Sequence, residues 1–168
     1  NAIDFSNAAS DSTKNFRLEA FSFTYDFGLN IFFDDMEDLR DIIGDTEIEF
    51  WQVEGLREDT YMDVDNFKDL ETAIELIMEG HFQEDLDLFK KLKEEGYVSD
   101  LANAQEWHDE NQFCEDMSDY DFGHYLMHDV SCIDIPEALQ GYISYEAYGR
   151  DALINDFVRV GNFIYSNH

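Results

Sequence analysis

The chain is poor in positive charge and cysteine, and it has no long apolar run. Only 10 of its 168 residues are lysine or arginine, so it lacks the basic surface with which proteins bind DNA, RNA or anionic membranes. Its two cysteines, Cys114 and Cys132, form no CxxC pair, which favours a reduced, cytosolic protein over a disulfide-stabilised one. No apolar run approaches the roughly 20 residues of a membrane span.

Motifs that carry chemistry are also missing. The sequence has no Gly-rich phosphate loop, no GxSxG motif and no cysteine in the context of a nucleophile. We therefore predict that the protein is not an enzyme and needs no cofactor. The chain begins at Asn1 rather than at methionine, so we expect N-terminal residues to be missing from this sequence.

Acidic residues, in contrast, are abundant: 40 Asp and Glu give a formal net charge of −30. They are spread evenly, with 15 acidic and 4 basic residues in 1–60, 13 and 4 in 61–107, and 12 and 2 in 108–168. Such a charge opposes compaction by self-repulsion, so we expect the protein to use its field. Thirty charges equal those on about 50 Å of duplex DNA. The expected partners are basic surfaces, cationic peptides or metal ions.

Apolar residues make up 44% of the chain and aromatic residues 15%, which is enough for a folded core. We predict an α+β fold, an elongated chain of three small abutting subdomains, because one proline and no low-complexity segment leave no room for linkers. A flexible lead-in is expected over 1–15. It precedes an N-terminal α+β subdomain (16–60), a helical subdomain (61–107) and a C-terminal α+β subdomain (108–168).

Local patterns predict the elements. Phe21, Phe23 and Tyr25 alternate with small polar residues, which indicates a half-buried strand. Further strands are expected over 31–33 and 47–52, and helices over 36–43, 66–78, 83–95, 99–106 and 119–130. A polar loop is expected over 108–113, and two apolar runs around Gly161-Asn162 predict a terminal hairpin.

Three patterns could suggest a cation site. The run from Asp63 to Asp69 has Lys68 where a calcium loop needs glycine, and the run from Asp119 has too few spaced oxygens. His124 and His128 share a helix face, as zinc ligands do, but Tyr125 stands where the HExxH motif has its general base. We predict no metal site. A metal-dependent enzyme at the two histidines is an alternative that predicts tight zinc binding.

The segment 135–151 predicts two short helices that meet at a bend. Pro136 suits a first helical turn, and Ser144 can cap a second helix with Glu146 in its first turn. Three tyrosines and the small residues Ala147 and Gly149 would allow close packing. By itself the segment is interpreted as a structural helical corner.

This segment also resembles the C-terminal signature of the ArdA-type antirestriction proteins, P-x-x-L-x-x-Y-x-x-Y-x-A-Y-G-R-D. The matching residues are Pro136, Leu139, Tyr142, Tyr145, Ala147, Tyr148, Gly149, Arg150 and Asp151. The resemblance implies an elongated acidic homodimer, joined largely through its C-terminal part, in the cytoplasm of a bacterial host cell. It also implies imitation of B-form DNA and occupation of the DNA groove of type I restriction–modification enzymes. We assign the signature itself to fold and dimer geometry.

The resulting hypothesis is a DNA mimic whose carboxylates stand where phosphates would be, and which binds neither nucleic acid nor membranes itself. Binding should be fast and should weaken with salt. Candidate carboxylates lie on helices and on the segments that lead into them: Asp34, Asp35, Glu37, Asp38, Asp41, Asp63, Asp65, Asp69, Glu71, Glu75, Glu84, Asp85, Asp87, Asp116, Asp119 and Asp121. The alternative is an acidic adaptor or cation-binding protein unrelated to DNA geometry.

Overall fold

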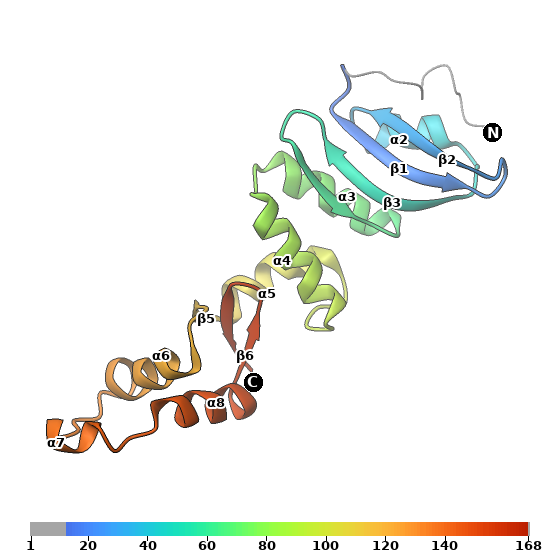
Figure 1. Cartoon of the computed structure of the whole chain (residues 1–168). Coiled ribbons are helices and arrows are strands. Elements are labelled where there is room, and N and C mark those ends of the chain that lie inside the picture. The colour runs from blue at the N-terminus through green and yellow to red at the C-terminus, as the bar shows by residue number, and fades with distance from the viewer. Residues whose placement is uncertain (1–12, 168) are drawn as a thin grey trace. The chain divides into compact units, whose positions relative to one another are not determined.

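The computed structural model describes residues 13–167 (Figure 1), so most of the predicted lead-in lies outside the described residues. Helices and strands are mixed, as predicted for an α+β fold. The chain divides into two compact units, a first unit that ends at Gln105 and a second unit that begins at Glu106. The further division of the first unit at residue 60 stays a prediction. Within 13–167, every helix is too short or too polar to cross a lipid bilayer.

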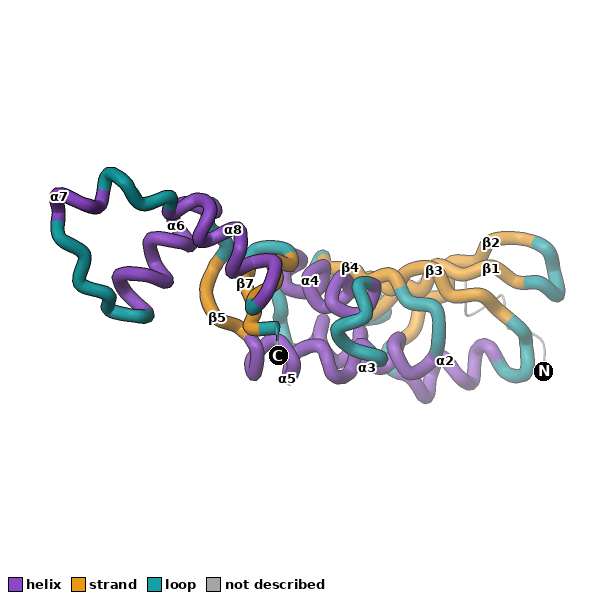
Figure 2. The backbone as a smooth tube through the Cα atoms, turned by 90° about the horizontal axis from the view of Figure 1, so that it is seen from below, coloured by secondary structure: helices purple, strands orange, loops and turns teal. Residues whose placement is uncertain are grey.

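A four-stranded antiparallel sheet organises the first unit, in the order β2-β1-β3-β4. Its strands are β1 (Phe16–Ser22), β2 (Phe27–Phe33), β3 (Ile48–Gly55) and β4 (Thr60–Asp63). In the register, Leu18 of β1 lies opposite Ile31 of β2 and Val53 of β3, and all three side chains are buried. Figure 2 shows that α2 (Met36–Ile43) and α3 (Phe67–Met78) lie on the same side of this sheet.

The helices of the first unit begin and end at the residues that their caps predict. The side chain of Asp35 accepts a hydrogen bond from the Asp38 amide at the start of α2, and Gly44, with φ +58°, ends it. Asn66 caps α3 in the same way. Together with α4 (Gln83–Glu94), these helices confirm three sequence predictions to within a residue.

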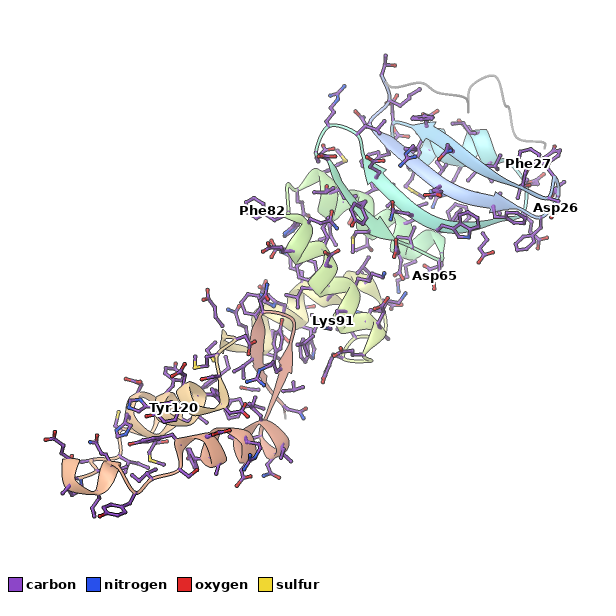
Figure 3. The ribbon with its side chains drawn as sticks, in the orientation of Figure 1. Asp26, Phe27, Asp65, Phe82, Lys91 and Tyr120 are labelled. Carbon is purple, nitrogen blue, oxygen red and sulfur yellow. The ribbon has the colours of Figure 1, made fainter. Side chains whose placement is uncertain are left out.

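Two predictions for the sheet are wrong. The inward-facing residues of β1 are Phe16, Leu18, Ala20 and Ser22, whereas Phe21 faces outward and Phe23 lies beyond the end of the strand. Alternation identifies two faces but does not say which one a neighbouring strand and helix will cover. Residues 61–63 belong to β4 and not to a helical block, because they pair with the end of β3. Asp26, with φ +58°, lies in the turn before Phe27 (Figure 3).

The second unit contains a three-stranded antiparallel sheet of order β5-β7-β6, and further helical segments lie between β5 and β6. The strands are β5 (Gln112–Glu115), β6 (Phe157–Val160) and β7 (Phe163–Ser166), and the hairpin turn at Gly161, with φ +57°, confirms its prediction. The helices are α6 (Asp119–His124), which continues as a π-helical segment (Tyr125–Val130), α7 (Glu137–Gln140) and α8 (Tyr145–Asn155). Phe122, Leu126 and Ile164 form the core.

The helix and the loop expected near the boundary between the units differ from the prediction. A 3₁₀ turn (Leu101–Asn103) leads into α5 (Ala104–Asn111), so the helix expected over 99–106 begins later and continues further. The polar loop expected over 108–113 is consequently the end of α5 and the start of β5. A tertiary pairing explains the latter, because Gln112 pairs with Tyr165 more than 50 residues along the chain.

Candidate functional site

The first group of candidate carboxylates surrounds the start of α2. Asp34 and Asp38 share Lys14, whose Nζ lies 3.2 Å from the Asp34 carboxylate and 3.4 Å from that of Asp38. The hydrogen bond to Asp34 is the main cause that raises the pKa of Lys14. Glu37 and Asp41 are exposed and form no ion pair within residues 13–167. The helix therefore presents both neutralised and free carboxylates.

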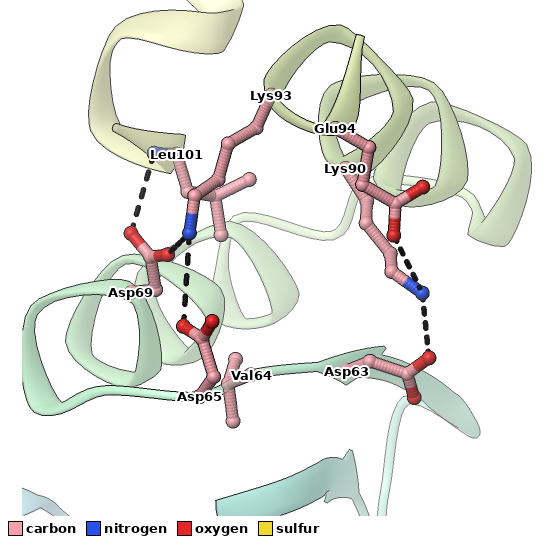
Figure 4. Close-up of a pocket in the computed structure, with 8 residues that line it drawn as sticks. All are labelled: Asp63, Val64, Asp65, Asp69, Lys90, Lys93, Glu94 and Leu101. Carbon is pink, nitrogen blue, oxygen red and sulfur yellow. Dashed lines mark hydrogen bonds and ion pairs between the residues drawn. The ribbon is translucent and has the colours of Figure 1, made fainter. Parts of the chain in front are cut away.

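The second group lies around a cavity of about 290 Å³ between β4, α3 and α4 (Figure 4). Lys93 of α4 contacts Asp69 and lies 3.7 Å from Asp65. Lys90, one turn earlier, lies 2.6 Å from Asp63 and 3.4 Å from Glu94. The two ammonium groups thus fill the positions that a cation would take among these carboxylates, and they connect α4 to β4 and α3.

Asp69 is the most deeply placed of these carboxylates, with 4% of its surface exposed. Burial by itself would raise its pKa, but hydrogen bonds from Lys93, the Leu101 amide and Asn66 outweigh burial and lower the pKa below its ordinary value. The Leu101 amide donates over 3.3 Å. Asp69 is therefore an internal anchor of the fold, and we leave it out of the partner-binding surface proposed below.

The third group lies before and within α6 in the second unit. Arg159 of β6 reaches Asp116 through Nε at 2.5 Å and Asp119 through Nη2 at 3.2 Å, and it donates to the Met117 carbonyl at 2.8 Å. Asp121 is exposed and forms no ion pair in the described part of the chain. One guanidinium therefore fixes two candidate carboxylates here, as Lys14 does at α2.

Nine candidates form no ion pair among the described residues, although Asp35 and Asp87 accept hydrogen bonds, and all but the half-buried Asp85 are exposed. They are Asp35, Glu37, Asp41, Glu71, Glu75, Glu84, Asp85, Asp87 and Asp121. Sequence reasoning did not separate these residues from the paired ones. The partner of a carboxylate on one element is a cation on another, and no spacing along the chain predicts that pairing.

The signature segment forms the helical corner that was predicted, and Gly149 allows its second helix to contact α6 closely. A Cβ at Gly149 of α8 would overlap the backbone carbonyl of Asp119 in α6. A Cβ at Gly123 would overlap the carbonyl of Tyr145 in the same way. The two helices thus touch backbone to backbone at a pair of glycines. Close packing was predicted at Gly149 but not at Gly123, which lies inside a helix where glycine is otherwise unfavourable.

Other signature residues divide between the core and the surface. Ser144 caps α8 as predicted, and Tyr145 is 4% exposed. Leu139 lies in α7 and is 54% exposed, whereas Tyr142 lies in the turn after α7 and is 89% exposed. Pro136, Tyr148, Arg150 and Asp151 are exposed, and Ala147 is half-buried. Tyr148 and Asp151 line a cavity of about 450 Å³ beside the π-helical segment.

The two histidines of α6 and the π-helical segment lie side by side, with ring centroids 4.4 Å apart. His128 Nε2 is 2.6 Å from the hydroxyl of Tyr145, so a signature residue connects α8 to the π-helical segment. Within residues 13–167, no group of three or more His, Cys, Asp or Glu side chains is arranged to hold a metal ion. The geometry gives this pair a packing role.

The family model of the antirestriction protein ArdA matches residues 28–165, which cover most of both units and the complete signature. A comparison with curated proteins gives no match. Since the family model spans most of the chain, the protein belongs to the ArdA family of antirestriction proteins.

Proposed function

We propose that the protein is a DNA mimic that blocks type I restriction–modification enzymes by occupying their DNA-binding groove. Family membership supports an antirestriction role, and antirestriction proteins of this family are inhibitors rather than enzymes. The partner is a basic surface of the restriction–modification enzyme. The proposed form is a homodimer in the bacterial cytoplasm, in which the number of carboxylates available to one enzyme doubles.

The observation that supports this proposal is that most of the few cations form ion pairs within the protein and still leave most carboxylates unpaired. Within residues 13–167, the lysine and arginine residues that form ion pairs with carboxylates are Lys14, Arg17, Lys68, Lys90, Lys93 and Arg159. Against 40 acidic residues, these pairs leave a large excess of carboxylates without a cation. An excess that is spread over the helices of both units, and not gathered in a tail, favours contact with an extended cationic groove.

The chemistry of such contact follows from charge. Carboxylates and phosphates both accept charge-assisted hydrogen bonds from arginine and lysine, so the unpaired carboxylates can take the place of backbone phosphates. Long-range attraction would speed the encounter, and added salt would slow it by screening. Ion-paired carboxylates such as Asp63 would contribute less, because their charge is already compensated.

Competition for DNA tests the proposal. A type I methyltransferase is bound to a fluorescein-labelled duplex that carries its recognition site, and the protein is added while fluorescence anisotropy is followed. We expect displacement of the duplex at near-stoichiometric amounts at low salt, and loss of displacement at about 0.5 M salt. An acidic adaptor would leave the duplex bound. The proposal is wrong if active enzyme keeps its DNA at low ionic strength.

A matched pair of variants sharpens the test. Glu71→Gln with Glu75→Gln removes two unpaired carboxylates from the exposed surface of α3. Asp129→Asn with Asp134→Asn removes two exposed carboxylates outside the candidate set. We expect the α3 variant to weaken displacement by roughly tenfold and the control to weaken it much less. Equal effects would mean that net charge, and not its position, sets the affinity.

A further inference from the structure

The first unit leaves one face of its four-stranded sheet uncovered by α2 and α3. Arg17, Glu19 and Phe21 of β1 point to this outward face, alternating with buried residues. Its end near Arg17 is polar: the guanidinium lies 2.6 Å from Glu54 and donates to the Asn30 side chain over 3.3 Å. Its other end, at the β1–β2 turn, is aromatic. The two ends of the face therefore have different chemistry.

The aromatic end is a cluster of three rings from two strands and a turn, Phe21, Phe23 and Trp51, which we call the aromatic cluster. The ring of Phe21 stacks on Trp51, with centroids 6.0 Å apart and an interplanar angle of 21°. Phe23 meets Phe21 edge to face at 5.4 Å. Phe23 is 60% exposed and Trp51 is 42% exposed. Large apolar surface that is gathered and exposed in this way marks an interaction site more often than a chance feature.

Two backbone features, a β-bulge and a glycine, lie next to the aromatic cluster. The pairing of β1 with β3 skips Trp51 between Gln52 and Phe50, so Trp51 is the extra residue of a β-bulge. On the other side of Phe21, the residue directly opposite in β2 is Gly28. A Cβ at Gly28 would come no closer than 3.9 Å to any heavy atom outside its immediate neighbours, so the space beside the ring is open.

The charges around the cluster indicate what fits it. Glu49 of β3 lies directly opposite Phe21, and Glu19 is the next outward residue of β1. Within residues 13–167 neither carboxylate forms an ion pair, and Arg17 is already held by Glu54. The cluster thus combines aromatic rings with unpaired carboxylates. A guanidinium is the side-chain group that satisfies both, because it stacks on aromatic faces and pairs with carboxylates.

We propose that the aromatic cluster, with Glu19 and Glu49, is a docking site for arginine side chains on the DNA-binding surface of the target enzyme. This inference rests on the proposed function and extends it. The carboxylates spread over the protein attract the enzyme, whereas the cluster slows its release through contacts that a phosphate backbone does not offer. Buried aromatic and arginine contacts commonly dominate the affinity of protein interfaces.

The first test distinguishes an effect on the dissociation rate from an effect on the association rate. Phe23→Ser removes the most exposed ring without changing charge, and Phe82→Ser removes a 79% exposed ring at the start of α4, which points away from the ribbon in Figure 3. Binding kinetics are measured with the methyltransferase immobilised on a sensor surface. We expect Phe23→Ser to raise the rate of dissociation from the enzyme about tenfold, with the association rate and its salt dependence unchanged. Phe82→Ser should match the wild type. Thermal melting by circular dichroism checks that both variants are folded.

The second test uses peptides and does not require the enzyme. In a Trp107→Phe background, Trp51 is the one remaining tryptophan, and its fluorescence reports on the cluster directly. We expect a deca-arginine peptide to change this fluorescence several-fold more than deca-lysine at equal concentration, and Phe23→Ser to reduce the difference. Equal responses to the two peptides would overturn the arginine assignment.

The outcomes distinguish the two proposals. If the wild type does not bind the methyltransferase, the proposed function fails, while the peptide comparison still decides whether the cluster prefers arginine. If the wild type binds and Phe23→Ser dissociates at the wild-type rate, the docking proposal alone is wrong. If Phe23→Ser instead converts a dimer to a monomer in sedimentation velocity, the cluster is covered by a second copy of the chain, and the proposed occupant is wrong.

Discussion

The two units of the protein hold their helices together by different means. In the first unit, Lys90 and Lys93 connect α4 to carboxylates of β4 and α3. In the second unit, α6 and α8 meet through backbone contact at Gly123 and Gly149. The second unit contains two basic residues, Arg150 and Arg159, so it has few cations with which to compensate charge between helices. A highly acidic chain can fold either by placing scarce cations between elements or by packing that needs none.

The largest effect on stability is expected from disrupting the backbone contact between α6 and α8. Gly149→Ala places a Cβ against the Asp119 carbonyl of α6, and backbone cannot move aside as a flexible side chain can. We expect a loss of about 3 kcal/mol or more in the free energy of unfolding of the second unit, measured by urea denaturation.

Gly141→Ala is the matched control, because a Cβ there has no neighbour within 4 Å and the backbone needs no positive φ. It should be neutral or slightly stabilising. If Gly149→Ala were equally harmless, the helices would not depend on this contact.

The next largest effect on stability is expected from removing the ammonium group of Lys93, which lies between α3 and α4. Lys93→Met leaves Asp69 buried without its ammonium partner, which costs about 3–5 kcal/mol for a fully buried pair. Because 29% of the Lys93 side chain is exposed, we expect a smaller loss of about 2 kcal/mol. Lys91→Met, at an exposed position with no ion pair among the described residues, should change stability by less than about 0.5 kcal/mol. Equal effects of the two variants would contradict a structural role of Lys93.

The pH dependence of the first unit should follow Asp69. Its pKa is lowered in the folded protein from the ordinary value of 3.8, so its contribution to stability is complete above that value and is lost as the pH falls through the folded pKa. We expect the wild type to be more stable than Asp69→Asn at pH 6, and the difference to shrink below pH 3.8. Urea denaturation of both proteins over this range measures it. A difference that grows with acidity would refute the assignment.

The smallest effect is expected at the hydrogen bond between α8 and the π-helical segment. Tyr145→Phe removes the hydroxyl that lies 2.6 Å from His128 Nε2, and we expect a loss of about 1 kcal/mol in thermal or urea unfolding. Tyr142→Phe provides the comparison, since that ring is 89% exposed and its hydroxyl can bond to water. A Tyr145→Phe variant as stable as Tyr142→Phe would show that this bond adds nothing.

Local signals in the sequence predicted the elements that have strong caps or turns. The helix from Met36 to Ile43 and the hairpin at Gly161 are examples, because capping carboxylates and glycine act within a few residues. The inward phase of β1 and the strand β5 could not be predicted, because they are fixed by pairing with distant segments. The short strand β4 pairs with the neighbouring β3, and the sequence prediction placed it in the helical block instead. The sequence also does not predict which candidate carboxylates form ion pairs, because their partner cations lie on other elements.

The large negative charge, its even spread, the mixed fold and the family signature can be predicted from composition and local spacing, which are properties of the chain. The three-dimensional packing was needed to show that Asp69 is an internal anchor, that Gly123 is the partner of Gly149, and that Phe21 stacks on Trp51 outside the core. Each of these depends on two segments that are distant in sequence and adjacent in space, and the free energy of such contacts arises from packing and charge compensation between them.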